Sequence, residues 1–192
     1  ALARNDLQVI AEEWAGRSPA WVEAERKGQV FALGDTVKNA VEGWYVPAYV
    51  IKGDPTRQIQ ALAPGLRTVD DLKRYAEVFK DPESPSQGRF LNSPSGWTSE
   101  IVNSQKLKAY GLSDSFVNFR TGSGAALDAE VGSSIRRGKP VLLYYWSPPP
   151  LIGRYQPVQL EEPPLDSAAW KTPADVAHPN PRAIRPLPLR PA

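Results

Sequence analysis

The sequence predicts an α/β fold with a mostly parallel sheet flanked by helices, and three observations lead to this prediction. Short apolar strand candidates alternate with amphipathic helix candidates at the spacing of βαβ units. The run KPVLLYYW is apolar along most of its length, which is typical of a strand buried on both faces. Capping and stop residues mark helix ends, such as Thr68 before one candidate helix and Gly111 after another.

Each element has a local reason. Pro19 suits the first position of a helix capped by Ser18, and Gly28 ends that helix. Pro47 argues against both a helix and a central strand position in the aromatic stretch 41–51, which we expect to be extended. The expected strands are residues 6–14, 29–34, 88–93, 114–122, 139–146 and 156–164, and the expected helices are residues 18–28, 68–79, 98–111 and 123–138.

Composition excludes several classes of protein. The chain has 192 residues, 41% of them apolar and 23% charged, which describes an ordinary globular domain or one large lobe. Basic and acidic residues alternate and the net charge is only +2, so no nucleic-acid-binding surface is expected. No apolar run is long enough to span a membrane, and no signal peptide is visible. There is no cysteine, and His178 is the only histidine, so a histidine-based triad, a metal site or a bound cofactor is not expected.

Three tryptophans occupy equivalent places in the pattern. Trp14, Trp97 and Trp146 each stand where an apolar run ends and turn residues begin. In α/β proteins the carboxyl ends of the strands border the crevice where ligands bind. Rings at several such ends predict an aromatic box for a cation that has no hydrogen to donate. Taken singly, each ring could equally be a half-buried structural aromatic.

The segment SGWTSE adds a site for an anion. A helix that begins near Trp97 leaves the amides of Thr98 and Ser99 without acceptors, at the positive end of the helix dipole. A ligand with a quaternary ammonium and a carboxylate on a short spacer, such as glycine betaine, matches this arrangement. Three cation–π contacts would contribute about 1.5–6 kcal/mol. A dissociation constant near 1 μM needs about 8 kcal/mol, so the anion contacts must contribute as well.

Several stretches together resemble the substrate-binding proteins of ABC transporters for glycine betaine, choline and proline betaine. They are EEWAGRSPAW, GWYVPAYV, SGWTSEIVN, LKAYGL, GSGAALDAEV, GKPVLLYYWSPPPLIGRY and QLEEPP, and they run from Asp6 to Trp170. The resemblance implies a two-lobed periplasmic-binding-protein fold of type II with the ligand at the hinge.

The resemblance also implies roles for particular residues. It places the box on Trp14, Trp97 and Trp146 and the ligand carboxylate on the amides of Thr98 and Ser99. Some members carry a histidine where this chain has Ser18, so the missing contact would come from elsewhere, with Arg17 as a candidate. Tyr45 lies in a stretch expected to cross between the lobes, where it either lines the pocket or packs at the hinge.

Compared with the family pattern, the first lobe is incomplete. Family members begin with a strand and helix segment that this chain lacks, and the proline-rich end does not resemble their continuation. The chain begins with Ala and contains no Met, which indicates a processed, truncated or frameshifted product. We expect residues 1–42 to be the remainder of the first lobe, 43–170 the second lobe, and 171–192 a disordered or non-native tail.

The expected function is that of a non-catalytic solute-binding component of an ABC importer. It would capture a quaternary-ammonium osmolyte in the periplasm or another extracytoplasmic space and deliver it to a permease, as an osmoprotectant. Glycine betaine, proline betaine, choline and carnitine all remain open as ligands. One alternative is a truncated fragment that no longer binds. The other is a hydrolase using Glu12 or Glu13 with Asp128, although adjacent carboxylates on a strand point to opposite faces.

Overall fold

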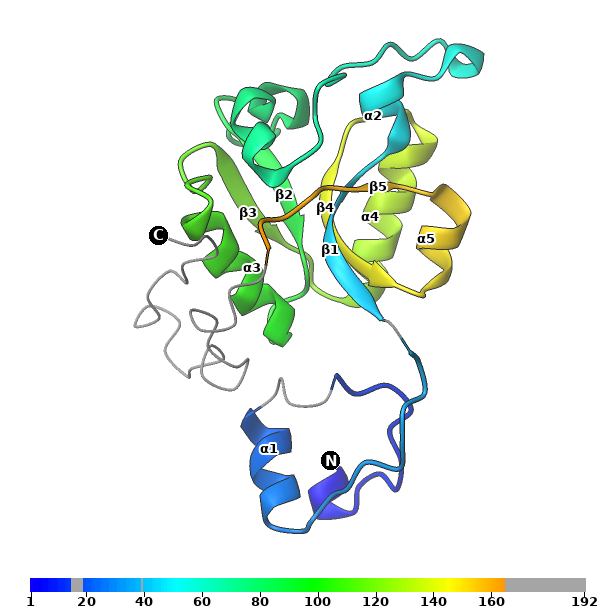
Figure 1. Ribbon diagram of the computed structural model, residues 1–192, viewed down its shortest axis with the longest axis vertical. Helices are drawn as coiled ribbons and strands as arrows, with labels where there is room; N and C mark the ends of the chain where they lie inside the picture. The colour runs from blue at the N-terminus through cyan, green and yellow to red at the C-terminus, as the bar shows by residue number, and fades with distance from the viewer. Residues whose placement is uncertain (15–18, 39, 165–192) are drawn as a thin grey trace.

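The computed structural model describes residues 1–14, 19–38 and 40–164, and these form two parts (Figure 1). The larger part is a sheet with helices packed on it. The smaller part, residues 1–38, holds a short 3₁₀ helix, Leu2–Arg4, and the helix α1, Pro19–Arg26. It lies beyond one end of the sheet and is joined to it by the residues that lead into the first strand (Figure 1).

The sheet has five strands in the order β3-β2-β4-β1-β5. Strands β2, β3 and β4 run parallel, whereas β1 runs antiparallel to both of its neighbours, β4 and β5. The expected mostly parallel sheet is therefore a mixed one with a parallel half. The strands are β1 Val41–Val46, β2 Gly88–Asn92, β3 Phe116–Arg120, β4 Leu142–Ser147 and β5 Val158–Gln159.

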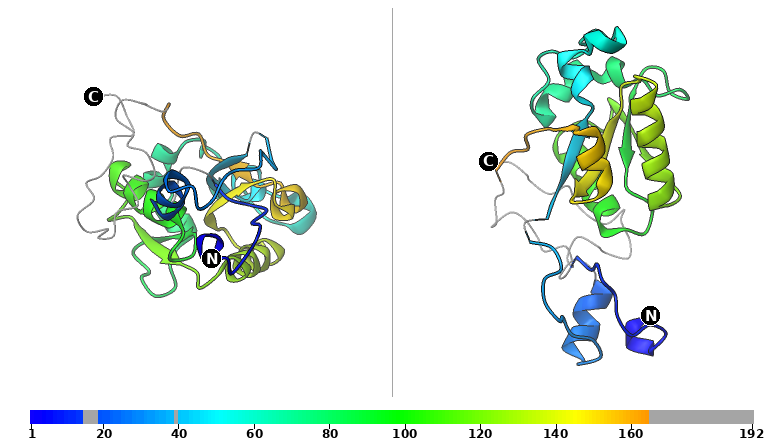
Figure 2. Two further views of the ribbon diagram at one scale, coloured as in Figure 1. Left: turned by 90° about the horizontal axis from the view of Figure 1, so that it is seen from below. Right: turned by 90° about the vertical axis from the view of Figure 1, so that its right-hand side faces the viewer.

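Two long helices cover opposite faces of the parallel half (Figures 1 and 2). Helix α3, Thr98–Ala109, connects β2 to β3, and helix α4, Gly124–Arg136, connects β3 back to β4. These connections cross the sheet in opposite directions. Because parallel crossovers are right-handed, the two helices must lie on different faces. The shorter helices are α2 Ala48–Lys52 and α5 Pro150–Tyr155, with 3₁₀ helices at Pro55–Arg57, Val69–Arg74 and Ala76–Phe79.

The core lies between the sheet and these helices, with Trp44 of β1 at its centre. Trp44 has no exposed surface, and its ring centroid lies 4.3 Å from that of Phe90 and 5.6 Å from that of Tyr110. Its indole N–H donates a 2.8 Å hydrogen bond to Oδ1 of Asn103 on α3. Trp44 thus joins strand β1 to helix α3 by a hydrogen bond and to its other neighbours by aromatic contacts.

Two expected strands at the amino end are wrong. Within the described residues, 6–14 and 29–34 have no strand pairing, although each carries a short run of apolar residues. Val9, Phe31 and Leu33 are 65%, 75% and 80% exposed. A strand needs a partner for its backbone and a surface for its apolar face. Pattern alone does not reveal whether the chain supplies them.

Other differences arise at local breaks. The residues after Pro47 form α2 instead of continuing as a strand, because Pro47 precedes the first helical turn, where no amide is needed. Strand β1 nevertheless pairs with a strand on each side, since Pro47 lies just outside it. The expected helix 68–79 is two 3₁₀ helices divided at Tyr75. Helix α5 was not expected, although Pro150 at its start suits a first helical position.

We predict that Asp71→Asn lowers the free energy of unfolding at pH 7 by about 0.5–2 kcal/mol. Asp71 accepts hydrogen bonds from the backbone amides of Thr68 and Arg67 and from the Thr68 hydroxyl, forming a capping box. The Thr68 amide is the main cause that lowers the pKa of Asp71 to about 2. Its contribution is therefore complete above about pH 4 and is lost as the pH falls towards 2.

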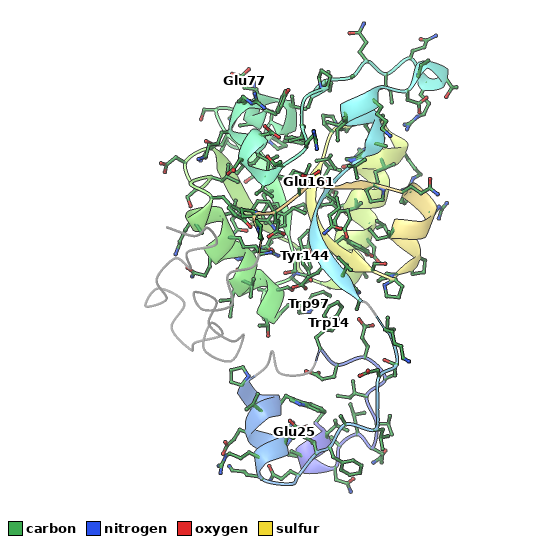
Figure 3. All side chains as sticks on the ribbon, viewed as in Figure 1. Trp14, Glu25, Glu77, Trp97, Tyr144 and Glu161 are labelled. Carbon is green, nitrogen blue, oxygen red and sulfur yellow. The ribbon has the colours of Figure 1, made fainter. Side chains whose placement is uncertain are left out.

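Urea unfolding at a series of pH values between 7 and 2 measures this difference. The gap between wild type and variant should close as the pH falls. The exposed Glu77 on the following 3₁₀ helix supplies the control Glu77→Gln (Figure 3). An equal loss of stability for both variants would contradict the role of the cap.

Candidate functional site

Two of the predicted box residues meet at the carboxyl ends of neighbouring parallel strands. Trp146 lies near the end of β4, and Trp97 follows β2 and precedes α3. Their ring centroids are 5.4 Å apart and the ring planes meet at 68°, an edge-to-face contact. This geometry is favourable for aromatic pairs. Trp97 remains 38% exposed, so part of its ring is available to a ligand.

Trp146 is held from its other side by Tyr145. The two rings stack with centroids 4.5 Å apart and planes 19° from parallel. The Tyr145 hydroxyl donates a 2.6 Å hydrogen bond to Oδ1 of Asp128 on α4. Burial, together with this hydrogen bond, raises the pKa of Tyr145 well above its usual value. The hydroxyl therefore stays protonated at physiological pH and keeps Asp128 in place.

A cleft of about 1100 Å³ lies between the two parts of the chain and runs to these residues. It is lined mainly by apolar side chains of residues 2–40 on one side and by the end of β4 with the start of α5 on the other. Its aromatic and acidic lining residues are Trp14, Trp21, Phe31, Tyr145, Trp146, Glu12, Glu13, Asp35 and Asp128.

Trp14 brings the smaller part of the chain to the site. It lines the same cleft as Trp146, and Figure 3 shows it on the N-terminal segment where that segment faces the foot of α3 and Trp97. The half-buried indole donates a 3.1 Å hydrogen bond from Nε1 to Oε1 of Glu12. The three predicted tryptophans thus belong to one region, with Trp97 joined to it through its contact with Trp146.

A buried polar network fixes the loop that carries Trp97. Asn92, at the end of β2, donates to Oδ1 of Asn118 and to the carbonyl of Glu100. Its own Oδ1 accepts from the Ser93 amide and from Nδ2 of Asn103. Asn92 is completely buried, so each of these bonds replaces one that water would have made. Sequence reasoning missed this network, because its members are ordinary polar residues far apart in the chain.

The predicted anion site falls at the start of α3. Thr98 and Ser99 are the first two residues of this helix. Trp97 occupies the N-cap position, and its side chain makes no capping hydrogen bond. The Ser99 hydroxyl donates to Oγ of Ser93 at 3.0 Å, which ties the first turn to the loop. Neither Thr98 nor Ser99 lines the large cleft.

The remaining predicted residues do not join this group. Tyr45 is only 4% exposed and belongs to the core, where it pairs with Leu143 and Gln159 near the end of β1 that is remote from Trp146. It does not line the cleft. Arg17 and Ser18 lie outside the described residues, as do Trp170 and the expected tail.

The Trp97 ring packs against Gly124, where a larger side chain would contact it. We therefore predict that Gly124→Val weakens ligand binding. A Cβ at position 124 would lie 3.4 Å from Cη2 and 3.5 Å from Cζ2 of Trp97, and the further methyl groups of valine would press on the ring. Ring displacement should cost about 1–2 kcal/mol, or roughly 5- to 30-fold in affinity. Titration of tryptophan fluorescence with glycine betaine or choline measures the change.

Gly122→Val is the matched control, because a Cβ at that position has no neighbour within 4 Å. An equal effect of both variants would mean that the loop conformation, and not the room beside Trp97, sets the affinity.

The described residues hold no group of three histidine, cysteine, aspartate or glutamate side chains placed to bind a metal ion. In the same part of the chain, no helix combines the length and apolarity that crossing a membrane requires.

Comparison with solved structures places this architecture among the type II periplasmic binding proteins. The glycine betaine and L-proline binding protein ProX of Borrelia burgdorferi superposes with a TM-score of 0.58 at 22% identity, covering 83% of this chain and 52% of that one. Lactococcal OpuAC, in its closed conformation with glycine betaine, superposes with a TM-score of 0.57 at 16% identity, covering 89% and 57%. At these identities the likeness establishes the fold.

The sequence establishes the family. The family described as the substrate binding domain of ABC-type glycine betaine transport systems matches residues 1–185, and the chain belongs to it. Proteins of this family bind solutes and are not enzymes, which confirms both the resemblance and the expected non-catalytic role.

Two proteins are similar to this chain in sequence. The trimethylamine N-oxide-binding protein of Pelagibacter ubique is 27% identical over 147 residues, which are 75% of this chain and 44% of that protein. The glycine betaine-binding periplasmic protein OusX of Dickeya dadantii is 32% identical over 82 residues, covering 42% and 24%. The chain thus spans less than half the length of these relatives and about half that of the solved structures.

Proposed function

We propose that this chain is the solute-binding component of an ABC importer and captures a small quaternary-ammonium osmolyte, such as glycine betaine or a relative, between Trp14, Trp97 and Trp146. The observation that carries the proposal is the contact of Trp97 with Trp146 beside a cleft that Trp14 also lines. A quaternary ammonium donates no hydrogen bond, so its recognition depends on aromatic faces and on the exclusion of water.

The names of the relatives support this ligand class. The two relatives are named for binding trimethylamine N-oxide and glycine betaine, and lactococcal OpuAC was solved with glycine betaine. A further structural neighbour is a choline-binding protein in complex with choline, and all three ligands carry a methylated nitrogen. If the ligand carries a carboxylate, the amides of Thr98 and Ser99, beside Trp97, are the proposed hydrogen-bond donors to it. Arg17 and Ser18 keep the roles proposed from the family pattern.

The two parts of the chain correspond, in this proposal, to two lobes. Residues 1–42 supply part of the first lobe and residues 43–170 supply the second. Ligand binding between them favours the closed arrangement, which is the form a permease would recognise. We also propose that the protein acts in the periplasm or another extracytoplasmic compartment, and the name of the Dickeya relative, a periplasmic protein, supports this.

Isothermal titration of the 192-residue chain with glycine betaine, choline and trimethylamine N-oxide tests the proposal. We expect saturable binding of at least one of them, with a change in tryptophan fluorescence. Glucose and free proline serve as ligands without a methylated nitrogen. The absence of binding by all three methylated amines would reject the proposal for this chain and favour a fragment that no longer binds.

A further inference from the structure

The charged side chains that line the cleft are all acidic among the residues that the structure describes. Among the described residues that line it, Glu12, Glu13, Asp35 and Asp128 are acidic, and none is lysine, arginine or histidine. The whole chain is nearly neutral, with a net charge of +2, so this separation is local. A low-dielectric cleft lined by one sign of charge concentrates ligands of the opposite sign.

Two of these carboxylates accept hydrogen bonds from aromatic side chains, one from a ring of the proposed box and one from a ring that stacks on the box. Glu12 accepts the indole N–H of Trp14 at 3.1 Å. Asp128 accepts the hydroxyl of Tyr145 at 2.6 Å, and Tyr145 stacks on Trp146. A hydrogen bond from a ring donor to an anion increases the electron density of the ring, which strengthens its attraction for a cation.

The groups suited to a carboxylate lie elsewhere. Thr98 and Ser99 begin α3 but do not line the cleft, and Ser99 already donates its hydroxyl to Ser93. A zwitterion whose ammonium lies among the aromatic rings must either reach the amides of Thr98 and Ser99 outside the cleft or place its carboxylate in a region that holds four other carboxylates. A ligand that is only cationic avoids this repulsion.

We propose that Glu12 and Asp128 are specificity-determining residues that make the cleft selective for a quaternary ammonium cation without a carboxylate over a zwitterionic betaine. This inference rests on the proposed function, because it concerns the ligand of the same cleft. It requires no change in the aromatic contacts, which serve both ligands equally.

Titration of the chain with choline and with glycine betaine at equal ionic strength tests the selectivity. We expect choline to bind about tenfold more tightly. Glu12→Gln and Asp128→Asn remove one charge each but keep an oxygen that accepts the same hydrogen bond. Each variant should lower the affinity for choline about two- to fivefold and leave the affinity for glycine betaine unchanged or slightly higher.

Glu25→Gln is the control, since Glu25 is exposed on α1 and does not line the cleft (Figure 3). Tighter binding of glycine betaine than of choline, or variants that shift both ligands alike, would overturn this inference while leaving the proposed function intact. If Arg17→Gln abolished binding of glycine betaine but not of choline, the inference would also be overturned, because the betaine carboxylate would then have a cationic partner. If choline, glycine betaine and trimethylamine N-oxide all failed to bind, the proposed function itself would be rejected, and the inference with it.

Discussion

Replacing Trp44 with alanine should lower the free energy of unfolding by about 3–5 kcal/mol, a large share of the 5–15 kcal/mol that usually holds a domain folded. The side chain is fully buried, lies 4.3 Å from Phe90, and gives Asn103 its indole hydrogen bond. The variant thus loses an aromatic contact, opens a cavity, and leaves a buried acceptor without its donor. Urea unfolding followed by far-UV circular dichroism measures the change.

Trp44→Phe separates the two contributions. It keeps a ring against Phe90 but removes the hydrogen bond to Asn103 and the smaller ring of the indole, so the expected loss is about 1–3 kcal/mol. Asn103 is also bonded to Asn92, at the base of the loop that carries Trp97. The phenylalanine variant should therefore weaken ligand binding more than its stability loss explains. Equal stability of Trp44→Phe and wild type would contradict the role of this bond.

The parallel half of the fold was predictable because each of its signals is local. Strands β2, β3 and β4 and helices α3 and α4 all appear where the apolar runs and Gly111 predict them, and the Ser123 side chain caps α4. The ends of these strands then define one edge of the sheet. Since Trp97 follows β2 and Trp146 lies near the end of β4, their proximity follows from topology once those strands are neighbours.

The amino end was not predictable for the opposite reason. Leu7, Val9, Phe31 and Leu33 follow a strand pattern, but pairing depends on backbone partners that the described residues do not provide. Likewise, the sequence around Asn92 does not indicate that its side chain forms hydrogen bonds with residues of α3 and β3. Long-range pairing and buried polar contacts are properties of the assembled chain, and a local pattern carries no information about them.

Replacing Trp97 with alanine should weaken binding of a quaternary ammonium ligand by about 1–3 kcal/mol, or roughly 5- to 150-fold. The variant loses one cation–π surface and also the edge-to-face contact that orients Trp146. Because Trp97 is 38% exposed and lies outside the core, its loss should change the free energy of unfolding far less than the loss of Trp44. Calorimetric titration with choline and glycine betaine measures the affinities.

Two further substitutions identify what Trp97 contributes. Trp97→Leu keeps much of the apolar surface but has no aromatic face, whereas Trp97→Phe keeps a smaller face. If the ring acts through its electrons, phenylalanine should retain more affinity than leucine; if it acts only by covering methyl groups, the two should be equal. Equal affinity of leucine and wild type would remove Trp97 from the site. The same result for Trp146→Leu would leave the cleft without an aromatic basis for binding a cation, because Trp14 alone supplies too little of the roughly 8 kcal/mol that micromolar binding requires.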